Sequence, residues 1–223
     1  MKRVNFLIFT VLMFTLFSCS KDENNNGNTN LTPWEAGYIP LYPGNYWVYE
    51  HYKIDTLGNE TFSDNYDSVV ITGIEIIGGV QYFVFEGTWM SSPDPMDTLF
   101  ALRDSAGYFV DPSGTIYFTD QNFTDTLETF TFVISNGDTL YESCYKMESE
   151  PQVVTVPAGT FETLNYNGTI RTIYPAPNVQ KIRDKDQLYA KNVGQVLDTY
   201  FYLGSPNRFE RRLKHYFVNQ QSK

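Results

Sequence analysis

The feature that most limits the fold of this chain is a repeated alternation of strand-forming stretches and turn residues from Gly44 onward. Val, Ile, Thr, Tyr and Phe dominate the stretches, and these β-branched and aromatic residues favour extended backbone. We expect strands within residues 46–54, 68–77, 80–88, 126–134, 139–147, 152–156, 195–203 and 208–218. Turns are expected at 57–59, 78–79, 106–107, 113–114, 136–138 and 204–207, where glycine, asparagine or aspartate is present. No long amphipathic helical period intervenes, so the pattern predicts an all-β antiparallel meander of roughly ten or more strands.

The last predicted strand indicates how the faces of the sheet divide. One side carries apolar residues with two basic ones between them: Phe209, Arg211, Leu213, His215 and Phe217. The other side is charged: Arg208, Glu210, Arg212 and Lys214. The basic residues are either an anion-binding site or a solvated face that protects an edge strand from aggregation, and we favour the second interpretation.

Aromatic residues make up 17% of the chain, with 17 Tyr and 17 Phe. Tyr and Trp rings can stack on sugar rings, so a carbohydrate-binding surface is one interpretation. We favour a packing role, because aromatic residues are common strand formers and fill large β cores. Trp34, Trp47 and Trp89 are the candidates for ligand stacking, and we expect Trp89 to be the most exposed of the three.

The sequence contains no catalytic signature. Cys144 lies in a predicted strand, where we interpret it as a small packed hydrophobe, and only His51 and His215 could serve as a base. No serine elbow, zinc motif or phosphate-binding glycine loop is present, and the acidic stretch 120–125 lacks calcium-loop spacing. We therefore predict no catalytic residues, no metal site and no cofactor. Paired carboxylates for glycoside hydrolysis meet in space, so sequence leaves that alternative open.

The amino-terminal residues indicate an export signal. Lys2 and Arg3 precede an apolar run at 4–17, which is shorter than the about 20 residues of a membrane-spanning helix. The segment 16–19, Leu-Phe-Ser-Cys, resembles a bacterial lipobox. This resemblance implies that residues 1–18 are a signal peptide and that Cys19 becomes the lipidated first residue of the mature protein. An ordinary secretory signal with cleavage elsewhere is the alternative. With Cys19 acylated, no internal disulfide can form.

The residues after Cys19 are polar. Lys21, Asp22 and Glu23 resemble the export tag of surface lipoproteins in Bacteroidetes-type bacteria, although a solvated tether would look the same. The Asn-rich run 24–30 has no apolar residue to bury and is expected to be disordered. We therefore divide the mature chain into a lipidated tether, 19–39, and a single all-β domain, 40–223. Removing residues 1–18 leaves 14 basic and 26 acidic residues, a net charge of −12, which disfavours nucleic acid as a partner.

Three segments carry a wider resemblance: 40–49 (Pro-Leu-Tyr-Pro-Gly-Asn-Tyr-Trp-Val-Tyr), 156–161 (Val-Pro-Ala-Gly-Thr-Phe) and 189–196 (Tyr-Ala-Lys-Asn-Val-Gly-Gln-Val). They resemble segments of an uncharacterised family of outer-membrane surface lipoproteins from the same bacterial group. The resemblance implies a strongly curved antiparallel sheet, half-barrel or barrel-like, similar to that of lipoprotein carriers. It also implies a cavity for an apolar ligand.

An Asp-Thr-Leu triplet recurs four times, at 55–57, 97–99, 125–127 and 138–140, with variants at 67–69 and 104–106. The triplets resemble the O-glycosylation acceptor of Bacteroidetes-type bacteria. This would make acceptors of Thr56, Ser68, Thr98, Ser105, Thr126 and Thr139. The alternative is structural, because Asp favours turns and Thr-Leu suits the start of a strand.

These observations predict a lipoprotein anchored to the outer membrane, facing the cell surface, that acts as a non-catalytic binding or envelope-structural module. One alternative is a carrier of an apolar or lipid ligand in a half-barrel cavity. The other is a carbohydrate-binding or glycoside-acting surface protein.

Overall fold

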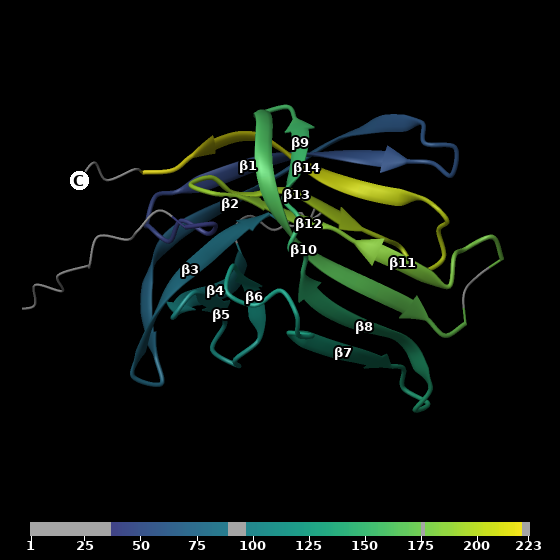
Figure 1. Ribbon diagram of the computed structural model, residues 1–223, viewed down its shortest axis with the longest axis horizontal. Helices are drawn as coiled ribbons and strands as arrows, with labels where there is room; N and C mark the ends of the chain where they lie inside the picture. The colour runs from purple at the N-terminus through teal and green to yellow at the C-terminus, as the bar shows by residue number, and fades with distance from the viewer. Residues whose placement is uncertain (1–36, 89–96, 175–176, 220–223) are drawn as a thin grey trace, which may run out of the picture. The chain divides into compact units, whose positions relative to one another are not determined.

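β-strands supply all the regular secondary structure of residues 37–88, 97–174 and 177–219, which are the residues that the computed structural model describes (Figure 1). These residues belong to one unit, Pro33–Lys223. The strands are β1 Tyr46–Ile54, β2 Glu60–Ile77, β3 Val80–Thr88, β4 Asp97–Ser105, β5 Tyr108–Val110, β6 Ile116–Thr119, β7 Glu128–Val133, β8 Thr139–Met147, β9 Gln152–Val156, β10 Gly159–Thr172, β11 Ile182–Lys185, β12 Gln187–Ala190, β13 Gly194–Tyr200 and β14 Arg208–Phe217. The predicted all-β class is confirmed.

Local sequence chemistry explains why several predicted strands have the observed bounds. β1, β3, β8 and β9 coincide with the predicted ranges. The turn between β2 and β3 consists of Gly78 and Gly79, whose φ angles are +60° and +81°. Only glycine adopts such angles without steric cost, so the two residues end β2 and start β3 at fixed positions.

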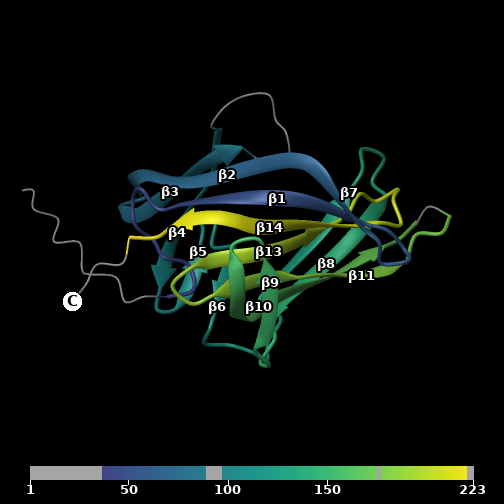
Figure 2. The same cartoon turned by 90° about the horizontal axis from the view of Figure 1, so that it is seen from above.

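All strands pair antiparallel in one sheet, with the order β6-β5-β4-β3-β2-β1-β14-β13-β12-β10-β8-β7, and β9 and β11 also pair with β10. The pairing of β1 with β14 joins the two ends of the described chain, and Figure 2 shows these strands side by side between β2 and β13. β14 is therefore an interior strand. The interpretation of its basic residues as an edge-strand guard is wrong.

The sheet curls until the strands at its two ends, β6 and β7, approach each other. The backbone N–H of Ile116, in β6, donates to Oε1 of Glu128, in β7, at 2.8 Å. The hydroxyl of Tyr166, in β10, donates to the carbonyl of Ile116, also at 2.8 Å. The sheet is thus nearly closed and barrel-like, as the predicted fold class stated. Its inner face carries a continuous core that includes Trp47, Phe85 and Phe118.

Strand β10 was missed by the sequence analysis because its centre is polar. Asparagine is depleted in strands, yet Asn165 and Asn167 are 1% and 7% exposed. The amide of Asn165 donates to the carboxylates of Glu148 and Asp186 at 3.0 and 2.9 Å, and its oxygen accepts from the N–H of Gln187 at 3.0 Å. Buried polar groups that are satisfied in this way are stable in a strand.

Cys144 lies on strand β8, but its side chain is exposed, so the prediction that it packs as a small hydrophobe is wrong. On the same strand, the odd-numbered residues Ser143 and Met147 are 5% and 1% exposed. Because side chains alternate along a strand, the odd-numbered residues of β8 point inward and Cys144 points outward.

Candidate functional site

A pocket lies on the inner face of the sheet. Its empty space, counting its opening to solvent, is about 530 Å³. The enclosed part is several times larger than the minimum that one water needs. The lining comes from eight strands and the segment before β1: Ile39, Trp47, Tyr49, Val69, Phe85, Phe100, Leu102, Tyr117, Tyr189, Gly194, Gln195 and Arg211.

Aromatic rings form one wall of this pocket as a row of near-parallel planes. The ring centroids of Trp47 and Phe85 are 6.4 Å apart with an interplanar angle of 19°. Phe85 and Phe100 follow at 4.6 Å and 24°, and Phe100 and Tyr117 at 5.6 Å and 24°. The row runs across β1, β3, β4 and β6, so four strands hold it in place. It offers apolar contact surface to a molecule in the pocket.

Trp47 is fixed in this row by its polar and steric contacts. Its indole Nε1 donates to the carbonyl of Val193 at 2.6 Å. Gly194 has φ +106°, and a Cβ there would lie 2.9 Å from Nε1 of Trp47. Only glycine suits both the backbone angle and the close approach of the indole. Trp47 was a predicted stacking residue, and it lies in the pocket wall at 3% exposure rather than on an open surface.

Arg211 closes the polar side of the pocket and is 2% exposed. Its Nε donates to both carboxylate oxygens of Asp67 at 2.9 and 2.8 Å, and its Nη1 donates to Oε1 of Gln195 at 3.2 Å. The guanidinium carbon lies 3.4 Å from the ring centroid of Tyr49. Burial acts to lower the pKa of Arg211, but Tyr49 and Asp67 outweigh it, so the pKa is raised and Arg211 stays charged.

His51 lies behind this ion pair and is 1% exposed. Its Nε2 lies 3.2 Å from Oδ2 of Asp67, and its Nδ1 lies 3.0 Å from the hydroxyl of Tyr200. Burial raises the pKa of the Tyr200 hydroxyl to about 12, which keeps that hydroxyl protonated near neutral pH. Arg211, Asp67 and His51 therefore form a buried polar chain beside the pocket that ends at the half-buried Tyr200.

A second buried carboxylate belongs to Asp198 on β13, which is 2% exposed. Its Oδ1 lies 3.7 Å from Nζ of Lys185. Burial raises the pKa of Asp198, and Lys185 and Arg211 offset only part of this shift. Charged groups this deep are costly unless they are paired, and here each carboxylate has a cationic neighbour.

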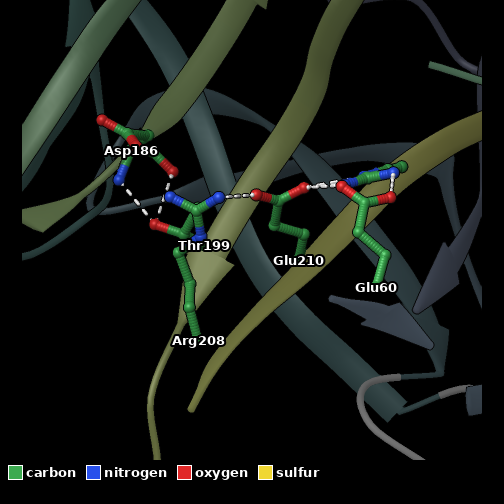
Figure 3. Close-up of polar contacts among 6 residues, drawn as sticks. Glu60, Asp186, Thr199, Arg208 and Glu210 are labelled. Atoms are coloured by element: carbon green, nitrogen blue, oxygen red, sulfur yellow. Dashed lines mark hydrogen bonds and ion pairs between the residues drawn. The ribbon is translucent and has the colours of Figure 1, made fainter. Parts of the chain in front are cut away.

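Arg208, Arg212 and Lys214 lie on the opposite face of β14 from Arg211, in ion pairs. Figure 3 shows the pair of Arg208 with Glu210. Glu210 accepts from Arg208 Nη2 and from Arg212 Nε, both at 2.7 Å. Arg212 also donates to both carboxylate oxygens of Glu60 at 2.8 and 2.7 Å. Nζ of Lys214 lies 2.6 Å from Oε1 of Glu50. The cluster predicted from sequence is therefore divided, because Arg211 serves the pocket and the other three residues bind neighbouring carboxylates.

The same figure contains a contact between β13 and the residue before β12. The backbone N–H of Asp186 donates to Oγ1 of Thr199 at 2.6 Å. Thr199 is 1% exposed, so this bond satisfies a buried hydroxyl beside the ion pairs.

Other predicted site residues have varied positions. Thr56, Ser68 and Thr126 are exposed, and Ser105 and Thr139 are half-buried. Thr98 lies on β4, and its side chain is outside the described set. Asp55 accepts the backbone N–H groups of Leu57 and Asn59 at 2.8 and 2.9 Å, which is the turn role of the structural alternative. Cys19, Lys21, Asp22, Glu23, Trp34 and Trp89 lie outside the described residues.

Sequence reasoning did not find the buried group of His51, Asp67 and Arg211. These residues lie on three adjacent strands, β1, β2 and β14, at positions that face the core. A polar residue at a core-facing position of each strand was the available signal. Only the strand order, which pairs the first strand with the last, brings them together.

Neither a metal-binding cluster nor a membrane-spanning helix occurs in the described ranges. Among these residues, no three or more His, Cys, Asp or Glu side chains are grouped to hold a metal ion. No helix of sufficient length and apolarity to cross a membrane occurs in them.

Known protein families and curated proteins gave no match to this chain. Among solved structures, a candidate lipoprotein from Parabacteroides distasonis is similar with a TM-score of 0.50 and 15% identity, over 82% of this chain and 99% of that chain. A candidate exported protein with a YmcC-like fold from Bacteroides fragilis has a TM-score of 0.49 and 15% identity, over 82% of this chain and all of that one. At this identity the first likeness shows a shared fold.

Proposed function

We propose that this protein is a lipoprotein of the bacterial envelope, anchored to the outer membrane through Cys19, whose β domain binds a small apolar ligand without catalysing a reaction. The lipobox resemblance at 16–19 supports the anchor. The shared fold with a candidate lipoprotein from Parabacteroides distasonis supports the envelope location. The polar segment with Lys21, Asp22 and Glu23 supports the cell-surface side.

The pocket with its row of aromatic rings is the observation that carries the binding function. Apolar surface removed from water contributes about 2.5 kcal/mol for each 100 Å² of ligand. The row from Trp47 to Tyr117 can provide such contact without rearranging, since four strands hold it. Association entropy opposes this gain, so we expect affinities from micromolar to millimolar for simple apolar probes.

A fluorescent apolar probe, N-phenyl-1-naphthylamine, tests the proposal. The full chain carrying Cys19→Ala is used, so that no acyl chain competes for the pocket. We expect saturable binding that Ile39→Trp, a substitution in the pocket lining, weakens at least tenfold. The control Ile76→Trp adds the same side chain at a position that is 68% exposed and distant from the lining, and should leave binding unchanged. Equal binding to both variants, or none to the parent chain, would contradict the proposal.

A further inference from the structure

The last strand of the sheet, β7, has one open edge. Within the described residues it pairs only with β8, and it ends the strand order (Figure 1). The backbone N–H of Ile134 donates to the carbonyl of Asp138, on the β8 side. Successive residues of an extended strand direct their backbone groups to opposite sides, so those of Thr129, Thr131 and Val133 point away from β8. They form a row that can accept another strand.

Apolar side chains lie on both faces of this edge, and on one of them Val133 stands beside Thr129 and Thr131. Phe130 and Phe132 are 53% and 40% exposed, and Val133 and Ile134 are 50% and 38% exposed. No charged residue or proline occurs from Thr129 to Ser135. Edge strands in monomers are usually protected by charges, prolines or short length, and in β7 only the first residue, Glu128, is charged.

The opposite end of the sheet differs. β6 has only four residues, and its Phe118 and Thr119 are each 0% exposed. The N–H and carbonyl of Ile116 are already bonded to Glu128 and Tyr166. β6 therefore lacks the open, apolar edge that β7 has.

We propose that two copies of this chain associate by antiparallel pairing of β7 with β7, about a two-fold axis at Thr131. The strand is close to a palindrome about this residue. Positions equidistant from it place Phe130 of one copy opposite Phe132 of the other, and Thr129 opposite Val133. Opposite residues of an antiparallel pair share a face, so the aromatic and β-branched pairs that stabilise sheets form on both sides. This self-complementarity favours a second copy over an unrelated strand.

Three aromatic rings at this interface are already in contact within one copy. The ring of Tyr141, in β8, stacks on Phe132 at 5.5 Å and 7°, and it lies 6.1 Å from Phe130. In the pair, the two sets of three rings become one cluster across the axis. The inner face of the sheet, which is exposed at β7 in a single copy, is then continued by the partner.

The area available sets the strength of this association. About half of each Phe ring surface of roughly 200 Å², with the adjacent Val and Ile, gives about 400 Å² per copy. The total of about 800 Å² is half of a standard interface. We therefore expect a reversible dimer that dissociates at about 10–1000 µM. This inference does not depend on the ligand pocket.

Sedimentation velocity of the full chain carrying Cys19→Ala, from 5 to 500 µM, tests the association. We expect a shift from monomer to dimer, and no larger species, since a two-fold pairing uses the open edge of β7 in both copies. Thr131→Lys puts two like charges at the axis and should weaken the dimer at least tenfold. Ser63→Lys, at an exposed position of β2, is the matched control and should dimerise as the parent does. A parent that stays monomeric at 500 µM, larger assemblies, or unchanged dimerisation of Thr131→Lys would overturn the proposal.

Chemical crosslinking tests the register. Thr131→Cys and Ser63→Cys are made separately in a chain carrying Cys144→Ser and Cys19→Ala, so that each protein holds one thiol. A short bifunctional maleimide should join two copies through position 131 several times faster than through position 63. Equal rates at both positions would refute an axis at Thr131.

Discussion

Replacing Arg211 by Met should cost more stability than any other single substitution in the pocket. The change removes the guanidinium that binds Asp67, whose side chain is 0% exposed. Removing one partner of a buried ion pair typically costs about 3–5 kcal/mol, because the other charge stays buried without compensation. Loss of the contact with the Tyr49 ring, at 3.4 Å, adds about 1 kcal/mol. A domain of this kind is stable by about 5–15 kcal/mol, so a large share would be lost.

Urea unfolding followed by tryptophan fluorescence and circular dichroism measures this change. The double variant Arg211→Met with Asp67→Asn is the matched control, since it removes both charges and leaves an amide oxygen that can bond to His51. We expect it to recover at least about 2 kcal/mol relative to the sum of the two single changes. The reasoning would be refuted if Arg211→Met cost less than about 1 kcal/mol, or if the two substitutions were simply additive.

Three further predictions concern the turn at the pocket, the outer ion pairs and the anchor. Gly194→Ala and Gly114→Ala both place a side chain at positive φ, +106° and +93°, but only the alanine at 194 also meets the indole of Trp47. Thermal unfolding should therefore show the Gly194→Ala protein to be about 1–3 kcal/mol less stable than the Gly114→Ala protein. The Arg212 side chain lowers the pKa of Glu60 from its usual 4.5, so the stability from this pair is present above pH 4.5 and is lost as the pH falls through the lower folded value. Urea midpoints at pH 7 and pH 3 should therefore differ less in Glu60→Gln than in the parent, and an unchanged difference would contradict the pairing. Cys19→Ala should move the native protein from the detergent phase to the aqueous phase. Mass spectrometry of the parent protein tests lipidation and glycosylation together. A mass equal to the polypeptide plus lipid alone would exclude O-glycosylation.

The glycosylation interpretation requires each triplet to be exposed, and the triplets differ in exposure. Thr56 is exposed in a turn, as an acceptor must be. Ser68 is also exposed, but the preceding Asp67 is 2% exposed and bound to Arg211, so its carboxylate is not available for recognition. Sequence similarity alone gives these triplets equal weight, whereas burial separates them.

The strand and turn pattern by itself determined the all-β class, because β-branched residues and glycine turns act over a few neighbouring residues. It predicted β1, β3, β8 and β9 to the residue. It failed at β10, where buried asparagines are satisfied by partners such as Asp186 that lie elsewhere in the chain.

The tertiary structure alone decided what the polar residues do. Arg211 and Arg212 are adjacent in sequence, yet one is buried against Asp67 and the other is bound to Glu60 on the opposite face. Their partners lie about 150 residues away, at separations of 144 and 152. Local propensity extends over a turn or a strand, whereas ion pairs and pockets depend on which strands become neighbours. In this protein the pairing of the last strand, β14, with the first, β1, brings both arginines to these partners.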